Sequence, residues 1–71
     1  MNSKLFKSIR IYHGHTQSAF ASLLGVSEST VAAIETGRRE ISDSVRIKLA
    51  RQFDITEEFI STLERINKFN F

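Results

Sequence analysis

The sequence predicts an all-α domain built from five short helices. Apolar residues recur at helical spacing, Ser or Thr residues stand where the helices would begin, and glycines stand where several of them would end. The 71 residues, 41% of them hydrophobic, suffice for a single domain over residues 1–71 and are too few for two. The sequence has no cysteine, so neither disulfides nor thiolate metal ligands stabilise it.

The first helix is expected over residues 3–13, before Gly14. Its apolar face is formed by residues at helical spacing: Leu5, Phe6, Ile9 and Tyr12. The second helix is expected to begin after Thr16, a good N-cap residue, and to end before Gly25, which can adopt the left-handed conformation that stops a helix. Its apolar residues are Phe20, Ala21, Leu23 and Leu24.

The third helix follows the second almost directly. Ser27 is its N-cap, Gly37 ends it, and Val31 and Ile34 form its inward face. Two helices joined by so few residues, with a glycine at the join, must cross at a steep angle, so residues 16–37 are expected to form a helix-turn-helix. Ala21 supplies the small side chain that a close crossing needs.

Two further helices complete the domain. Ser42 or Asp43 can cap the fourth, and Thr56 can cap the fifth. Acidic residues at positions 57 and 58 suit the positive end of the dipole of the fifth helix. The inward residues of these helices are expected to be Val45, Leu49, Phe53, Phe59 and Leu63.

Positive charge is concentrated in the first half of the chain. Residues 1–39 carry five basic and two acidic side chains, whereas residues 40–71 carry five basic and six acidic ones. This asymmetry favours an anionic partner for one face, with an ordinary mixed surface as the alternative. No segment resembles a signal peptide or a membrane span, so we expect no membrane partner and a soluble, cytoplasmic protein.

The helix-turn-helix segment resembles the phage Cro and C1 repressor type of helix-turn-helix domain, also called the XRE type. The residues that carry the resemblance are Gln17, Ala21, Gly25, Val31, Ile34, Glu35 and Gly37, with Arg10 before them and "LARQFDIT" and "EEFISTL" after them. The resemblance covers roughly residues 3–65. It implies a compact lambda-repressor-like bundle and a sequence-specific DNA-binding transcriptional regulator, with no cofactor and no catalytic activity.

The resemblance places the start of the third helix against base edges in the major groove. The implied base-contacting residues are Ser27, Glu28, Ser29, Ala32 and Ala33. Serine can donate to or accept from a base, glutamate can accept from a cytosine amino group, and an alanine methyl can pack on a thymine methyl. Alternatively, the alanines only let the helix approach the groove closely.

A second set of residues is implied to contact phosphates: Thr16, Gln17, Thr30, Thr36, Arg38 and Arg39. Gln17 stands at the start of the second helix, where the helix N-terminus attracts anions. Arg38 and Arg39 follow the third helix and are the expected ionic contacts, with a solvated loop as the alternative.

The family also pairs an arginine of the first helix with a glutamate near the end of the third, which here implies an ion pair between Arg10 and Glu35. If the pair is partly buried, Glu35 is a structural anion that does not face DNA. Two separately solvated charges are the alternative.

Other features indicate neither an enzyme nor a metal site. His13 and His15 have no cysteine or acidic partner nearby, and the sequence contains no nucleophile-elbow or phosphate-loop motif. Residues 66–71 form a tail in which Phe69 and Phe71 would be exposed on a monomer, so we expect a homodimer that uses this region, with packing back onto the core as the alternative.

The expected partner is a double-stranded, roughly palindromic DNA operator. The resemblance favours a repressor of the Cro-like or of the phage or mobile-element immunity type, which acts in a bacterial or phage-infected cell. An antitoxin-type regulator, or a module that binds another protein and contacts DNA weakly or not at all, remains the alternative. Glu28 and the modest net charge of +2 support this alternative.

Overall fold

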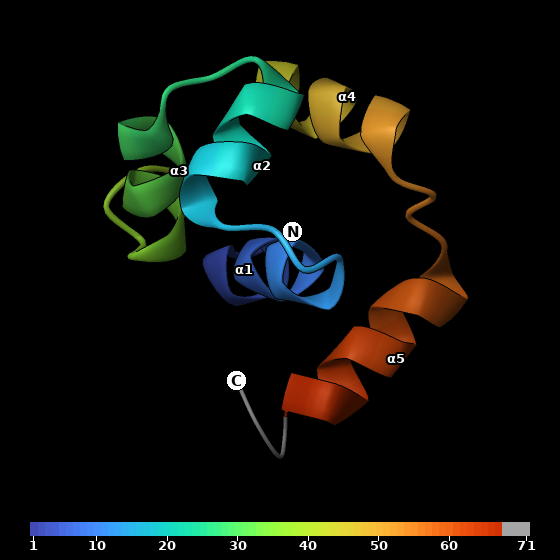
Figure 1. Ribbon diagram of the computed structural model, residues 1–71. Helices are drawn as coiled ribbons and strands as arrows, with labels where there is room; N and C mark the ends of the chain where they lie inside the picture. The colour runs from blue at the N-terminus through green and yellow to red at the C-terminus, as the bar shows by residue number, and fades with distance from the viewer. Residues whose placement is uncertain (68–71) are drawn as a thin grey trace.

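The computed structural model describes residues 1–67, which form five α-helices and no strand. The helices are α1 (Ser3–Tyr12), α2 (Gln17–Leu24), α3 (Glu28–Glu35), α4 (Asp43–Gln52) and α5 (Glu57–Asn67). Figure 1 shows α1 at the centre of the bundle, α2 and α3 on one side of it and α5 on another. The expected all-α fold is confirmed, whereas Phe69 and Phe71 lie outside the described residues.

Hydroxyl side chains cap four of the helices at their N-termini. In each case the side-chain oxygen accepts a hydrogen bond from the backbone N–H three residues later, as expected of an N-cap. The capping residues are Thr16, Ser27, Ser42 and Thr56. The fourth helix is thus capped by Ser42, while Asp43 is its first helical residue. Asn2 caps α1 in the same way, by accepting from the Leu5 N–H.

Glycines in the left-handed conformation end α2 and α3. Gly25 has a φ of +69° and Gly37 a φ of +79°. Just beyond each glycine the chain bonds back to the helix: the Val26 N–H donates to the Ala21 carbonyl at 3.0 Å, and the Arg38 N–H donates to the Ala33 carbonyl at 3.0 Å. These bonds satisfy carbonyl groups that a helix end otherwise leaves without partners.

Apolar side chains from all five helices and the α3–α4 loop form one core. Its buried members are Phe6, Ile9, Phe20, Ala21, Leu24, Val31, Ile34, Ile41, Val45, Leu49 and Leu63. The rings of Phe6 and Phe20 meet edge to face, with centroids 5.3 Å apart. Because residues of α1, α2 and α3 share this core, the helix-turn-helix is fixed to the rest of the bundle.

One residue assigned to the apolar face of the first helix lies largely at the surface instead. Tyr12 is 53% exposed. Tyr12 occupies the last position of α1, where its ring packs edge to face on Phe59 at the rim of the core and leaves the side chain partly open to solvent. Helical spacing predicted the direction of this side chain correctly but not its depth.

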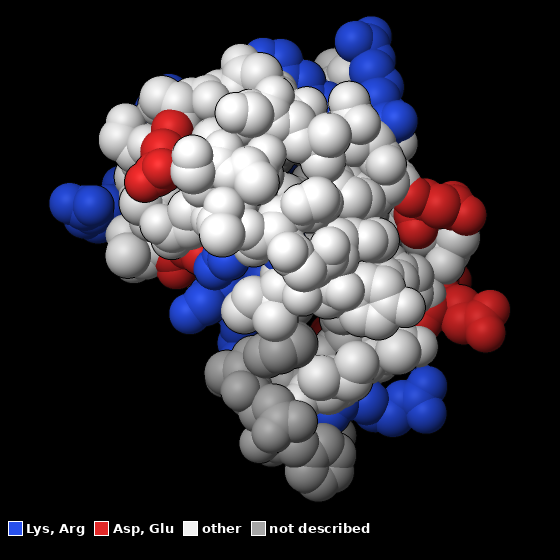
Figure 2. All heavy atoms as spheres, in the orientation of Figure 1, with Lys and Arg blue, Asp and Glu red and all other residues white. Residues whose placement is uncertain are grey.

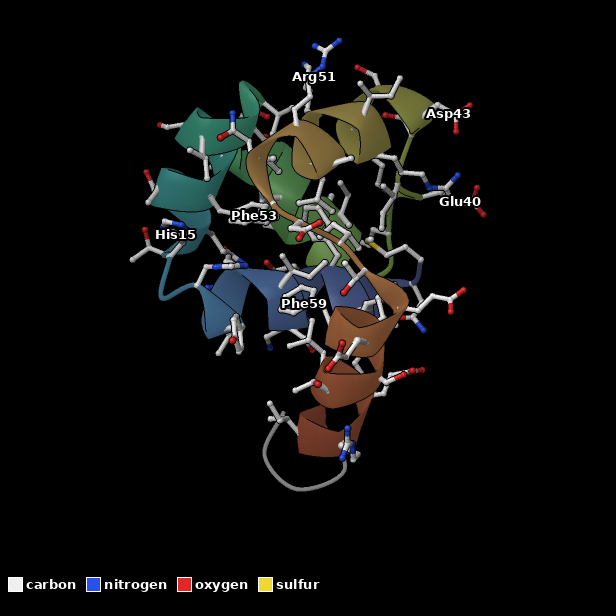
Figure 3. The ribbon with its side chains drawn as sticks, turned by 90° about the vertical axis from the view of Figure 1, so that its right-hand side faces the viewer. His15, Glu40, Asp43, Arg51, Phe53 and Phe59 are labelled. Carbon is white, nitrogen blue, oxygen red and sulfur yellow. The ribbon has the colours of Figure 1, made fainter. Side chains whose placement is uncertain are left out.

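An aromatic rim joins the α1–α2 turn to α4 and α5. The His13 ring stacks on Phe53, with centroids 4.3 Å apart, and lies 5.8 Å from the Phe59 ring. His15 lies at the edge of the same group, and Figure 3 shows it on the same side as Phe53. Burial lowers the pKa of His13 below its usual 6.5, and the nearby His15 lowers it further. Both histidines therefore pack against aromatic rings.

Within residues 1–67, no helix combines the length and the apolar character that crossing a membrane requires.

Candidate nucleic-acid interface

The helix-turn-helix is formed by α2, a short connection and α3. Ala21 is 3% exposed, and its carbonyl accepts the bond from Val26 that closes the turn. Val31 and Ile34 of α3 are buried, which turns the opposite side of α3 outward. Figure 1 shows α3 at the outer edge of the bundle, on the side away from α5.

Small and polar side chains cover the outward side of α3. Glu28 and Ser29 are exposed, and Ala32 and Ala33 are half-buried. Neither Lys nor Arg occurs within α3. This surface lets a groove approach the helix backbone closely, but the helix itself contributes no positive side chain.

Three hydroxyl groups meet at the start of α3 and form what we call the hydroxyl cluster: Ser27, Ser29 and Thr30. Ser27 Oγ lies 3.0 Å from Ser29 Oγ and 2.8 Å from Thr30 Oγ1, and it also accepts from the Thr30 N–H at 3.2 Å. The Ser27 oxygen is therefore largely engaged in capping its own helix. Ser29 is the exposed member with the most hydrogen-bonding capacity left for a ligand.

A bidentate ion pair links α1 to α3. Arg10 Nε donates to Glu35 Oε2 at 2.6 Å, and Arg10 Nη2 donates to Glu35 Oε1 at 3.0 Å. The two side chains are 13% and 3% exposed. Arg10 Nη1 also donates to the His15 carbonyl at 2.8 Å, so the same guanidinium fixes the turn that leads into α2. Glu35 is thus neutralised and turned away from the outward side of α3.

Gln17 joins this ion pair, a contact that sequence reasoning missed. Its Nε2 donates to Glu35 Oε1 at 3.1 Å. The bond ties the start of α2 to the end of α3 and leaves the second Nε2 hydrogen and the amide oxygen of Gln17 for other partners. The two residues are 18 apart in sequence, and no local pattern signals their contact.

The other residues expected to contact phosphates lie before α2 and after α3. Thr16 caps α2, so its oxygen accepts from the Ala19 N–H at 3.0 Å. Thr36 donates to the Ala32 and Ala33 carbonyls and accepts from Arg38 Nε at 3.3 Å. Arg39 reaches Thr30 in the hydroxyl cluster at 3.4 Å. Both arginines are exposed.

Most of the face shown in Figure 2 is uncharged, with charged groups around its edges, a basic group toward its lower middle and an acidic group on the side where Figure 1 places α3. Acidic side chains gather along the edge where Figure 1 places the α4–α5 connection and the start of α5. The acidic residues of that segment are Asp54, Glu57 and Glu58, all of them exposed. A polyanion would be repelled there, whereas on α3 it would meet one exposed carboxylate, that of Glu28.

A family model for helix-turn-helix domains matches residues 6–60. The chain belongs to the helix-turn-helix family. This result confirms the resemblance to the Cro/C1 type, and the matched span contains the ion pair, both helices of the motif and the two arginines that follow.

A curated relative is similar to this helix-turn-helix protein over nearly the whole length of both chains. It is an uncharacterized HTH-type transcriptional regulator from Methanocaldococcus jannaschii, 39% identical over 64 residues that cover 90% of this chain and 96% of the relative. No solved structure matches the chain significantly.

Proposed function

We propose that this helix-turn-helix protein is a sequence-specific transcriptional regulator that binds double-stranded DNA with α3 in the major groove, without a cofactor and without catalysis. The observation that carries the proposal is the outward side of α3. It presents small and polar side chains, and the ion pair of Arg10 with Glu35 fixes α3 to α1. The name of the relative, a transcriptional regulator, agrees with this function.

Base contacts fall to the N-terminal half of α3. Ser29 donates to or accepts from a base edge, Glu28 accepts from a cytosine amino group, and the methyl groups of Ala32 and Ala33 pack on thymine methyls. Ser27 contributes less than these residues, because its hydroxyl already serves as the N-cap of the helix.

Phosphate contacts set the affinity and the register of the complex. The start of α2 offers Thr16 and the unused amide hydrogen of Gln17, together with a helix N-terminus that favours anions. Thr30 and Thr36 add hydroxyl groups on either side of α3. Arg38 supplies an ionic contact to a phosphate, and each phosphate neutralised in this way makes binding weaker in salt, with a slope of roughly −0.9 per contact. Arg39 adds a second positive charge to the same loop.

The regulator acts as a homodimer on a roughly palindromic operator. Two copies place their α3 helices in successive major grooves about 34 Å apart. The dimer contact involves the C-terminal tail, including Phe69 and Phe71, which lie outside the described residues. In this arrangement the protein acts as a repressor of the Cro-like or mobile-element immunity type, by blocking access of RNA polymerase to the promoter.

Selection of bound sites from a random duplex pool tests the proposal. We expect an enriched half-site that appears twice with inverted symmetry, and binding that weakens as salt rises. A pool without enrichment contradicts sequence-specific binding. Absence of salt-dependent binding to any duplex favours instead a module that binds another protein, or an antitoxin-type regulator with little direct DNA binding.

A further inference from the structure

The two consecutive arginines after α3 contact different threonines of this segment. Arg38 Nε donates to Thr36 at the C-terminal cap, whereas Arg39 Nη1 donates to Thr30 in the N-terminal half. The two threonines are six positions apart, which corresponds to about 9 Å along the helix axis. The two arginines, although adjacent in sequence, are therefore offered to different parts of a bound ligand.

The backbone of this segment gives both side chains a fixed starting point. The N–H groups of Arg38 and Arg39 both donate to the Ala33 carbonyl, at 3.0 and 3.2 Å. The preceding Gly37 N–H donates to the Ile34 carbonyl at 3.1 Å. The chain is therefore anchored on the last turn of α3, so the backbone from which the two arginine side chains extend has a defined position.

The contact with Thr30 brings the Arg39 guanidinium to the hydroxyl cluster. Thr30 Oγ1 lies 2.8 Å from Ser27 Oγ, which lies 3.0 Å from Ser29 Oγ. In a recognition helix, the N-terminal residues are those that contact base edges. Arg39 is thus placed beside the part of α3 that meets the bases, although it comes from the loop after the helix.

An arginine at this position supplies chemistry that α3 lacks. The side chains of α3 on its outward side are Ser, Glu, Ala and Thr, and none of them makes the bidentate contact with the O6 and N7 atoms of guanine that is the commonest specific contact of arginine with DNA. A guanidinium has five N–H donors, and Thr30 accepts from one of them. A parallel pair of donors is left for guanine.

We propose that Arg39 is a specificity-determining residue that contacts a guanine of each half-site in the major groove. Thr30 is the positioning residue that holds its guanidinium at the N-terminal half of α3. Arg38, which donates to Thr36 at the C-terminal cap, contacts a phosphate. The proposal rests on the proposed function, since it assigns two residues their roles within that DNA complex.

Site selection with matched variants tests this assignment. The wild-type protein is expected to select one guanine in each half-site by about 5- to 150-fold over other bases. Arg39→Ala loses the preference at that position and keeps the preferences elsewhere. Arg38→Ala, the matched control, keeps the guanine and lowers affinity equally for all sequences, with a salt slope that is smaller by roughly 0.9.

Replacement of the selected guanine by 7-deazaguanine removes the N7 acceptor and provides a second measurement. The replacement is expected to weaken binding of the wild-type protein and of Arg38→Ala, but not of Arg39→Ala. Thr30→Val is expected to lower the guanine preference and to leave the salt slope unchanged, which separates positioning from loss of charge. Circular dichroism at 222 nm verifies that each variant is folded.

Two results contradict different claims. If Arg39→Ala weakens all sequences equally and lowers the salt slope as Arg38→Ala does, Arg39 contacts a phosphate and the assignment is wrong. If the wild-type protein itself selects no site, the proposed function fails, independently of Arg39.

Discussion

Loss of Arg10 is expected to destabilise the fold far more than loss of an exposed arginine. Arg10→Ala leaves the Glu35 carboxylate, 3% exposed, without its bidentate partner. An uncompensated buried charge of this kind costs about 3–5 kcal/mol. At about 4–8 °C for each kcal/mol in a domain of this size, the melting temperature falls by at least about 12 °C.

Glu35→Gln is expected to lower the free energy of unfolding by about 3 kcal/mol, the lower end of the range for an uncompensated buried charge. The guanidinium of Arg10 is 13% exposed and keeps the His15 carbonyl as an acceptor, so it is less isolated than the carboxylate would be. The double variant Arg10→Met with Glu35→Leu is expected to recover most of the loss, because an apolar pair removes both buried charges.

Thermal and urea unfolding followed by circular dichroism measures these differences. Arg46→Ala is the matched control, since Arg46 pairs with Asp43 at 3.2 Å while the two side chains are 50% and 92% exposed. Its expected cost is about 0–1 kcal/mol. If Arg10→Ala costs no more than Arg46→Ala, the inference that burial makes this ion pair structurally necessary is refuted.

Three further predictions concern single positions. Gly37→Ala is expected to lower the free energy of unfolding by about 1–2 kcal/mol, because the φ of +79° is unfavourable for a residue with a Cβ. No atom lies within 4 Å of an added Cβ, so the backbone conformation alone accounts for the loss. An unchanged melting temperature in thermal unfolding contradicts this prediction. Because the pKa of His13 is lowered in the folded state, the unfolded state binds more protons, so stability falls as pH drops through 6.5 and stops falling below the folded pKa. Urea midpoints at pH 7.5 and 5.5 should therefore differ less for His13→Gln than for the wild type, and equal differences count against the prediction. Glu28→Ala is expected to change the preferred base at one operator position in site selection; a uniform rise in affinity would show instead that Glu28 only repels DNA and stabilises the helix dipole.

The local part of the fold was predictable because its signals act over three or four residues. Ser27 and Thr16 accept from N–H groups three positions away, and Gly25 and Gly37 need only their own backbone conformation to stop a helix. The choice between Ser42 and Asp43 was left open, because both are good N-cap residues and the two are adjacent. The structure gives the cap to Ser42.

The finer arrangement of the interface depends on contacts that helical periodicity does not encode. The bond from Gln17 to Glu35 joins residues 18 apart in sequence and depends on how α2 packs against α3. The contact of Arg39 with Thr30 depends on how the chain turns after Gly37, which the identity of a glycine does not specify. Sequence reasoning therefore grouped Arg38 with Arg39, whereas the structure holds them at different threonines.

The packing of α5 on α1 has a consequence for the order in which the domain can assemble during synthesis. Leu63 of α5 is fully buried in the same core as Phe6 and Ile9 of α1, and α5 makes its main helix contacts with α1. Translation produces α1 before α5, so the side of α1 that α5 covers stays exposed until α5 has left the ribosome. A nascent chain that stops before Leu63 would leave apolar side chains of α1 exposed, and exposed apolar surface of this kind favours aggregation.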